Sequence, residues 1–223
     1  MTLATTNEVL DLLVDWRFVT PTLLERYLTR TPTQVKNELR RLRNKELVES
    51  YSFIGKQVYY RLTPAACRSL GVSRRHAGPL GPQAIRQYYG MLDFAAATTP
   101  PRHFLSKEDW LSISQALNAT AAQMPRGFLY FDLSKQEGEE QVRLGKVYVD
   151  GRAEPASLLN KARRFIAAHR SNSAIRKLVT QDDFLFAFVT ESEGKADAIA
   201  EAAERAEFVE PIRLHVSPDL SVI

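Results

Sequence analysis

One stretch of the sequence carries side chains that can bind nucleic-acid bases and phosphates. Residues 36–45 contain five of the chain's 30 Lys and Arg residues, and Gln34, Asn37 and Asn44 lie among or beside them. In the major groove of duplex DNA, Asn and Gln can pair with adenine through two hydrogen bonds, Arg can pair with guanine, and Lys neutralises phosphates. These residue types therefore suit contact with a polyanion that displays bases.

The same stretch is predicted to form a helix with two unlike sides. Thr31-Pro32 is a helix start signal, because threonine favours the N-cap position and proline the first turn. Val35, Leu39 and Leu42 follow at spacings of four and three, which places them on one side. At about 100° per residue, the opposite side holds Thr33, Lys36, Asn37, Arg40 and Asn44, with Gln34 and Arg41 on one flank. We expect the apolar side to pack inward and the polar side to face solvent or a ligand.

Three further helices and a hairpin are predicted around this helix. A helix over residues 7–16 and a second one that begins at residues 20–21 precede it, each with leucines at helical spacing. After residue 47 the period falls from about 3.6 to about 2, and two β-like runs flank the tip "IGK", which predicts a β-hairpin. A last helix is predicted over residues 63–71, with a glycine at its end.

This order of elements resembles a winged helix-turn-helix domain over residues 7–71. The resemblance is carried by "TPTLLERYL" as the supporting helix, "TPTQVKNELRRLRNKELVE" as the recognition helix and entry strand, and "YSFIGKQVYYRLTPAACRSLG" as wing and exit. It implies that the recognition helix enters the major groove of double-stranded DNA while the hairpin tip holds the adjacent backbone. The residues expected to make base or near-base contacts are Thr33, Gln34, Lys36, Asn37 and Arg40. Those expected to contact phosphates are Arg41, Lys45, Lys56 and Arg30.

Two other interpretations of these residues are open. A run of charge on one helical face is often only a solvated surface. Winged helices also serve as protein-interaction modules, and failure to bind any duplex, whatever the salt concentration, would favour that role.

The composition after residue 71 predicts a domain boundary. Residues 72–82 hold two glycines, two prolines and two arginines without periodicity, which is typical of a linker. We therefore expect a DNA-binding domain over residues 1–71, and over residues 83–223 a helical connector plus an α+β domain with a regulatory or interaction role. The connector carries an apolar stripe formed by Ile85, Tyr88, Tyr89 and Leu92. The stripe fits either a core or the seam of a homodimer, and the second domain is where a protein partner could bind.

From residue 104 onward, helical and β-like periods alternate. The predicted helices cover residues 107–122, 156–169 and 195–206, and the predicted strands cover residues 127–134, 141–150, 183–191 and 212–217. The last strand, helix and strand form a candidate parallel unit with a right-handed crossover. The predicted fold class is α+β, in which a small mixed α/β domain follows the N-terminal one.

Taken together, the two halves resemble the replication-relaxation proteins of plasmids and integrated elements. The likeness lies in "QVYYRLTPAACRSLGV" followed by the "QAIRQYYGMLDF" helix. In that group the C-terminal half is similar to a degenerate restriction-endonuclease-like fold, which implies metal-dependent DNA cleavage as an alternative activity. Such a nuclease site needs two or three carboxylates at neighbouring strand ends to hold Mg²⁺, and a lysine nearby.

The sequence offers little support for that nuclease site. About one Asp/Glu-x-Lys triplet is expected by chance, and the one present, Glu193-Gly194-Lys195, follows a predicted strand instead of lying inside one. The best remaining candidates are Asp132, Asp150 and Lys146. We therefore expect no catalytic residues and no enzyme activity.

Charge, cysteine and histidine content bound the remaining classes. Residues 1–80 hold 13 Lys and Arg against 7 Asp and Glu, a net +6, whereas residues 81–223 hold 17 against 19, a net −2. This asymmetry favours an N-terminal half that meets a polyanion. The single cysteine, Cys67, cannot form an internal disulfide, and the four histidines are widely separated, so we expect no metal and no cofactor. An N-terminus without a basic start or an apolar segment predicts a cytoplasmic protein with no membrane partner.

The sequence thus predicts a sequence-specific, duplex DNA-binding protein that regulates transcription or replication of a mobile element or plasmid. The alternatives are a metal-dependent nuclease or DNA-processing accessory protein, and a winged-helix protein-interaction module. Selective retention of one promoter or origin fragment would favour the regulator, whereas Mg²⁺-dependent nicking of a plasmid would favour the nuclease.

Overall fold

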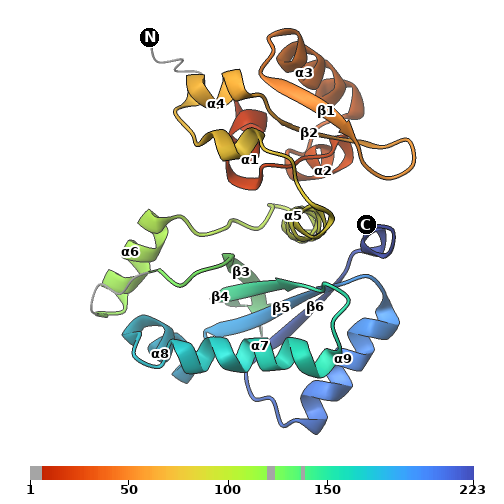
Figure 1. Cartoon of the computed structure of the whole chain (residues 1–223). Helices are drawn as coiled ribbons and strands as arrows, with labels where there is room; N and C mark the ends of the chain where they lie inside the picture. The colour runs from red at the N-terminus through yellow and green to blue at the C-terminus, as the bar shows by residue number, and fades with distance from the viewer. Residues whose placement is uncertain (1–6, 120–123, 137–138) are drawn as a thin grey trace. The chain divides into compact units, whose positions relative to one another are not determined.

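The chain forms two compact units in this computed structural model (Figure 1). The residues that the structure describes are 7–119, 124–136 and 139–223. The first unit comprises residues 1–101 together with 222–223, and the second comprises residues 102–221. Each unit combines helices with a β-sheet, so the predicted α+β class is confirmed. Within the described ranges, no helix has the length and apolar character needed to cross a membrane.

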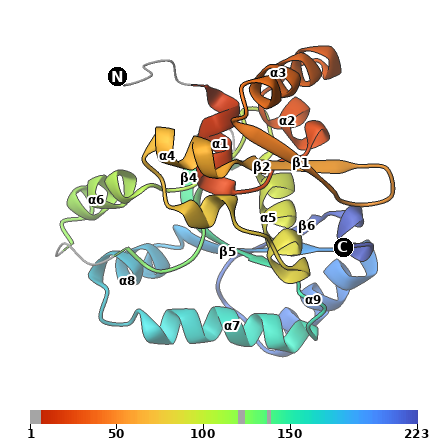
Figure 2. The same cartoon turned by 45° about the horizontal axis from the view of Figure 1, so that its top comes forward.

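The first unit contains helices and one hairpin in the predicted order. Its elements are α1 (Glu8–Trp16), α2 (Pro21–Tyr27), α3 (Pro32–Asn44), β1 (Val48–Ser52), β2 (Val58–Leu62), α4 (Pro64–Leu70), the 3-10 helix η1 (Arg74–Ala77) and α5 (Pro82–Ala95). Strands β1 and β2 pair antiparallel, with Val48 opposite Leu62. Helix α3 contacts α2 and β1, and Figure 2 shows α1, α2 and α3 grouped beside the hairpin.

Three helices of this unit begin where a threonine precedes a proline. The side chains of Thr20, Thr31 and Thr63 each accept a hydrogen bond from the backbone N–H three residues further on. The proline that follows has no N–H to leave unsatisfied in the first turn. The predicted start sites are therefore confirmed, and each cap contributes about 1 kcal/mol to stability.

The apolar side of α3 packs into the core of the first unit, as predicted. Val35, Leu39 and Leu42 expose only 1–2% of their surfaces. Burial of a side chain of this size contributes roughly 1.5–3 kcal/mol. Because three such residues lie on one side, their burial determines which side of α3 stays outward.

A backbone pairing that the sequence does not predict ties the helices to the hairpin. Val19, which lies between α1 and α2, forms an antiparallel bridge with Tyr60 of β2. The Val19 N–H donates to the Tyr60 carbonyl at 3.2 Å, and the Tyr60 N–H donates to the Val19 carbonyl at 2.8 Å. The bridge adds a short third segment to the two-stranded sheet.

Residues 72–82 are packed against the first unit, so the expectation of a linker here is wrong. The helix η1 lies in this segment and contacts α4 and β2. Arg61 donates to the carbonyl of Gly78 at 2.7 Å, and Arg17 donates to the carbonyl of Arg75. These hydrogen bonds join the segment to β2 and to the end of α1.

Helix α5 also belongs to the first unit, and not to the second domain as expected. Arg26 of α2 and Asp93 of α5 form an ion pair at 2.5 Å. Within the predicted apolar stripe, the ring of Tyr89 lies 5.4 Å from that of Phe53, and Tyr89 is only 6% exposed. The units therefore divide after Pro101, and this part of the stripe is buried within the chain.

The second unit is built on a four-stranded sheet. Its elements are α6 (Lys107–Ala116), β3 (Leu129–Gln136), β4 (Glu139–Val149), α7 (Pro155–Ala168), α8 (Ser173–Thr180), β5 (Phe184–Thr190), α9 (Glu193–Arg205), β6 (Ile212–Val216) and the 3-10 helix η2 (Pro218–Ser221). The strand order is β3-β4-β5-β6, with β3 antiparallel to β4. Strand β4 is parallel to β5 and β5 to β6, so the predicted final parallel unit is confirmed.

Two details of this unit differ from the sequence prediction. Helix α6 ends at Ala116, although the prediction continued to residue 122, and residues 120–123 lie outside the described ranges. Helix α8 was not predicted. Asn172 caps this helix by accepting hydrogen bonds from the backbone N–H groups of Ala174 and Ile175. The helix has only eight residues, too few for a clear helical period in the sequence.

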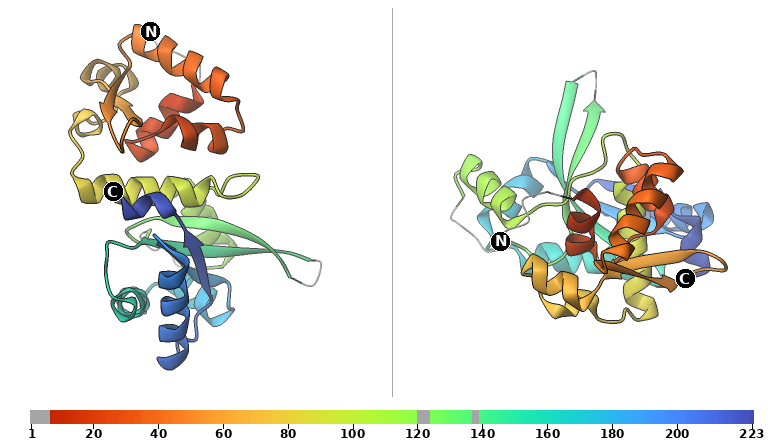
Figure 3. Two further views of the ribbon diagram at one scale, coloured as in Figure 1. Left: turned by 90° about the vertical axis from the view of Figure 1, so that its right-hand side faces the viewer. Right: turned by 90° about the horizontal axis from the view of Figure 1, so that it is seen from above.

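One face of the sheet is covered by helices α7 and α9 (Figure 3). Phe184, Phe186 and Phe188 of β5 are fully buried, and alternation along a strand places all three on one face. Phe165 of α7 contacts the rings of Phe184 and Phe186, so this is the helix-covered face. Strand β5 pairs with β4 only from Leu144 onward, and Figure 3 shows that β3 and β4 extend together beyond the end of β5.

Candidate nucleic-acid interface

The outward side of α3 is solvent-exposed along its length. The residues predicted to face outward, Thr33, Lys36, Asn37, Arg40 and Asn44, are all exposed, as are Gln34 and Arg41 on the flank. Arg43, which is not among the predicted DNA contacts, is exposed on the same helix. The helix therefore presents a cationic and amide-rich surface about 20 Å long, from its 13 residues at 1.5 Å each.

Gln34 is exposed, but its side-chain oxygen is already hydrogen-bonded. Gln34 Oε1 accepts from the Thr31 backbone N–H at 2.9 Å and from Thr31 Oγ1 at 3.1 Å. In return, Thr31 Oγ1 accepts from the Gln34 backbone N–H at 3.3 Å. This reciprocal capping box stabilises the first turn of α3 and fixes the orientation of the Gln34 amide.

Asn37 and Arg40 form a second pair on the outward side. Arg40 Nη2 donates to Asn37 Oδ1 at 3.3 Å, and the two residues are one helical turn apart. The bond joins the Arg40 guanidinium to the Asn37 amide on the exposed side.

Two of the residues predicted to contact phosphates are paired with acidic side chains. Arg30 pairs with Glu8, and Arg41 donates to Glu38 Oε1 at 2.7 Å, an atom that also accepts from Asn7. These residues line a depression together with Asp11. Burial acts to raise the pKa of Glu38, but the hydrogen bonds from Asn7 and Arg41 and the nearby Arg charges hold that pKa below its usual value. This edge of the surface therefore carries mixed charge.

Lys45 and Lys56, the other two predicted phosphate contacts, are exposed. Lys45 is the C-cap of α3. Lys56 lies in the hairpin tip, where Gly55 takes a left-handed φ of 55° and the Phe53 N–H donates to the Gln57 carbonyl at 3.0 Å. No ion pair of either lysine is formed among the described residues. Both ammonium groups are thus available to an anion.

An aromatic cluster holds the base of the hairpin. The ring of Phe53 lies 5.3 Å from Phe18 and 6.3 Å from Tyr59, and Phe18 stacks on Tyr59 at 5.0 Å. Each such aromatic pair contributes about 0.5–1.5 kcal/mol beyond area burial. The hairpin tip therefore extends from a packed base next to α3.

The carboxylates considered for a nuclease site are buried in separate ion pairs. Asp132 of β3 is 1% exposed and lies 2.7 Å from Arg213 Nη2 and 3.8 Å from Arg102 Nε. Asp150, fully buried after β4, lies 2.6 Å from Lys195 Nζ, and its other oxygen accepts from the Ala153 N–H at 2.9 Å. Each carboxylate therefore already has cationic partners.

Lys146 lies away from Asp132. Strand register places Lys146 opposite Leu129 and Asp132 opposite Arg143, so the two side chains project from opposite faces of the sheet. Lys146 Nζ is 4.6 Å from the centre of the Phe165 ring, on the helix-covered face, and donates to the Arg126 carbonyl at 2.9 Å. The two groups cannot act on one ion.

Burial lowers the pKa of Lys146 to about 8. Gly127, whose φ is 103°, allows Lys146 Nζ to approach the backbone closely, because a Cβ there would lie 2.3 Å from Lys146 Nζ.

In the described ranges, no group of three or more His, Cys, Asp or Glu side chains is arranged to hold a metal ion.

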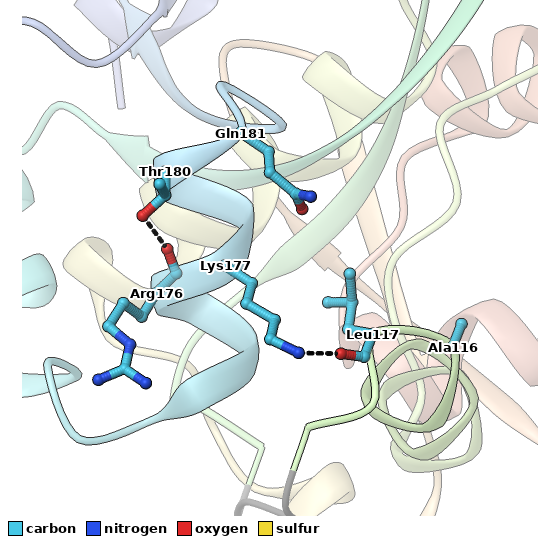
Figure 4. A pocket seen from close by; sticks show the side chains of 6 residues that line it. All are labelled: Ala116, Leu117, Arg176, Lys177, Thr180 and Gln181. Carbon is cyan, nitrogen blue, oxygen red and sulfur yellow. Dashed lines mark hydrogen bonds between the residues drawn. The ribbon is translucent and has the colours of Figure 1, made fainter.

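Outside α3, two cationic side chains, Arg176 and Lys177, line a pocket between α6 and α8 (Figure 4). Its lining consists of Ala116, Leu117, Arg176, Lys177, Thr180 and Gln181. Lys177 Nζ donates to the Leu117 carbonyl at 2.5 Å, and Thr180 Oγ1 donates to the Arg176 carbonyl at 2.8 Å. Lys177 thus satisfies the C-terminal carbonyls of α6, and this use accounts for its position.

Comparison of the chain with protein-family models, with curated proteins and with solved structures found no match.

Proposed function

We propose that the first unit is a winged helix-turn-helix domain that binds duplex DNA sequence-specifically. In this assignment α2 supports α3, α3 enters the major groove, and the β1–β2 hairpin is the wing. The observation that carries the proposal is the exposed side of α3, where Lys36, Asn37 and Arg40 stand beside a hairpin that ends in Lys56. An α-helix about 10–12 Å wide fits a major groove about 12 Å wide.

Two further features support this assignment. The Val19–Tyr60 bridge joins the segment between α1 and α2 to the hairpin, which fixes the wing relative to the helices. The aromatic cluster under Phe53 holds the hairpin base, so that contact by the tip costs little ordering entropy. The second unit, in which Asp132 and Asp150 are internally paired, then has a regulatory or interaction role in a regulator of transcription or replication on a mobile element.

The contact roles follow from position. Arg40 and Asn37 lie near the middle of α3 and would face base edges, while Lys45 at the C-cap of α3 and Lys56 in the hairpin tip would meet phosphates. Arg41 and Arg30 pair with Glu38 and Glu8. They are therefore weaker phosphate contacts than the sequence alone predicts, because binding DNA would require exchange of an ion pair.

Duplex affinity as a function of salt tests the proposal. The full chain, titrated against a fluorescent random-sequence duplex, should bind with a slope of log K against log salt of about −3 to −5, from three to five released counterions. Arg40→Ala should then weaken binding to a selected duplex by about 1–3 kcal/mol and relax its sequence preference, whereas Lys56→Ala should weaken all duplexes alike. Absence of duplex binding at any salt concentration would contradict the proposal and favour a protein-interaction role.

A further inference from the structure

Two amide side chains on the outward side of α3, Gln34 and Asn37, accept hydrogen bonds at their oxygens from within the helix and its cap. Gln34 Oε1 accepts from Thr31, through both its backbone N–H and its hydroxyl. Asn37 Oδ1 accepts from the Arg40 guanidinium. Both amides lie in the first half of α3, which is the part of a recognition helix that meets base edges.

The chemistry of the partners determines which amide atom faces which group. A backbone N–H and a guanidinium are donors without acceptor capacity. The atom that faces each of them must therefore be the amide oxygen, and the NH₂ group of each amide points elsewhere. The orientation of both side chains follows from hydrogen-bond satisfaction alone.

The groups left to face a ligand between Gln34 and Arg40 are mostly donors. Gln34 and Asn37 present NH₂ groups, Arg40 a guanidinium and Lys36 an ammonium, and all four residues are exposed. Thr33 is neutral in this respect because a hydroxyl both donates and accepts. The side-chain oxygen of Asn44 accepts no hydrogen bond from the described residues, but Asn44 is the last residue of the helix.

We propose that α3 selects guanine, and not adenine, as its preferred base; this rests on the proposed function of the first unit. In the major groove guanine presents two adjacent acceptors, N7 and O6, whereas adenine presents one acceptor and one donor. Bidentate recognition of adenine needs the oxygen as well as the NH₂ group of an amide. Gln34 Oε1 already accepts two hydrogen bonds, which use both of its lone pairs, so the Gln34 amide complements acceptors only. Asn37 Oδ1 keeps one lone pair but is turned toward Arg40, one helical turn along α3. The ligand class is therefore duplex DNA with neighbouring guanines on the strands that α3 faces.

Selection of bound duplexes from a random pool tests the inference with the full chain. Guanine should dominate at two or more neighbouring positions of the enriched sequence. Replacing one of those guanines by 7-deazaguanine, which lacks the N7 acceptor, should weaken binding about 5- to 150-fold. Enrichment of adenine at the central positions, or full affinity for the 7-deazaguanine duplexes, would overturn the inference and leave DNA binding intact. Enrichment of no sequence at all would overturn it together with the proposed function.

Arg40→Ala provides an independent test, because it removes the donor toward which Asn37 Oδ1 is turned. Besides losing the guanine read by Arg40 itself, the variant should change the preference at one adjacent position from guanine to adenine. Arg43→Ala is the matched control: it removes an exposed arginine of the same helix without touching the Asn37–Arg40 bond, and should keep every base preference. An Arg40→Ala variant that retains guanine at all remaining positions would overturn the role given to Asn37.

Discussion

Charged side chains are used in opposite ways on α3 and on the strands of the second unit. On α3, Lys36 and Arg40 point into solvent. In the sheet, Asp132 and Lys146 are buried and each is satisfied by partners inside the same unit. Since an ion moved out of water loses several kcal/mol of solvation, a buried charge must be paired, and a paired charge is not free to bind a ligand. Residue type alone therefore does not mark a site, because a charged side chain can bind a ligand only where it is also exposed and lacks a strong partner.

The largest effect is expected on stability, when a buried charge of the second unit loses its partner. Asp132→Ala leaves Arg213 and Arg102 without their carboxylate, and should lower the free energy of unfolding by about 3–5 kcal/mol. Urea denaturation of the full chain measures this loss. Asp197→Ala, which removes an exposed carboxylate of α9, is the control and should change stability by less than about 0.5 kcal/mol. Unchanged stability of Asp132→Ala, with loss of a Mg²⁺-dependent nicking activity, would instead make Asp132 a catalytic group.

A smaller effect is expected from the titration of Lys146. Burial holds its pKa at about 8 in the folded chain, against about 10.4 when unfolded, so the unfolded state binds more protons between these values. Stability from this group therefore rises as pH increases through that window. The stability of the wild type relative to Lys146→Met should increase by up to about 2 kcal/mol between pH 7 and pH 9.5. Denaturation of both proteins at the two pH values measures the difference, and no change in it would show that Lys146 is not desolvated.

The capping box of α3 should contribute about half as much. Thr31→Ala removes the hydroxyl that accepts the Gln34 N–H, and should lower the free energy of unfolding by about 1 kcal/mol. Thr33→Ala, two positions further into the helix and exposed, should have little effect on stability in the same denaturation measurement. Equal losses from the two variants would mean that the box does not stabilise α3.

The smallest effect is expected on the salt dependence of duplex binding, when one exposed lysine is removed from either unit. Lys56→Ala should reduce the slope of log K against log salt by about one counterion and weaken every duplex by a similar factor. Lys107→Ala removes an exposed lysine of α6 in the second unit and should leave the slope unchanged. If both variants lowered the slope equally, the cationic surface would not be confined to the first unit.

Much of the first unit could be predicted because its signals are local. The Thr-Pro pairs at residues 20, 31 and 63 mark helix starts, and the spacing of Val35 and Leu39 identifies the buried side of α3. The capping box was also readable, since Thr31 and Gln34 stand three apart. The Asn37–Arg40 hydrogen bond, in contrast, could be found only in the structure, because it depends on side-chain rotamers.

The parts that could not be predicted depend on non-local pairing. The Val19–Tyr60 bridge involves two single residues, and nothing in the sequence around Val19 marks a strand. Asp132 and Lys146 both lie on predicted strands, but only the β3–β4 register shows that they project from opposite faces. Likewise, the packing of residues 72–82 rests on arginines far along the chain, such as Arg17 and Arg61, that donate to its carbonyls.

Methylation interference on a selected duplex tests most directly whether α3 reads the major groove. Methylation of guanine N7 modifies the major groove, whereas methylation of adenine N3 modifies the minor groove. Guanine N7 methylation should block binding of the full chain at the central positions, and Arg40→Ala should lose sensitivity at one of them, while adenine N3 methylation there has no effect. Interference from adenine N3 alone, or from neither modification, would contradict the placement of α3 in the major groove.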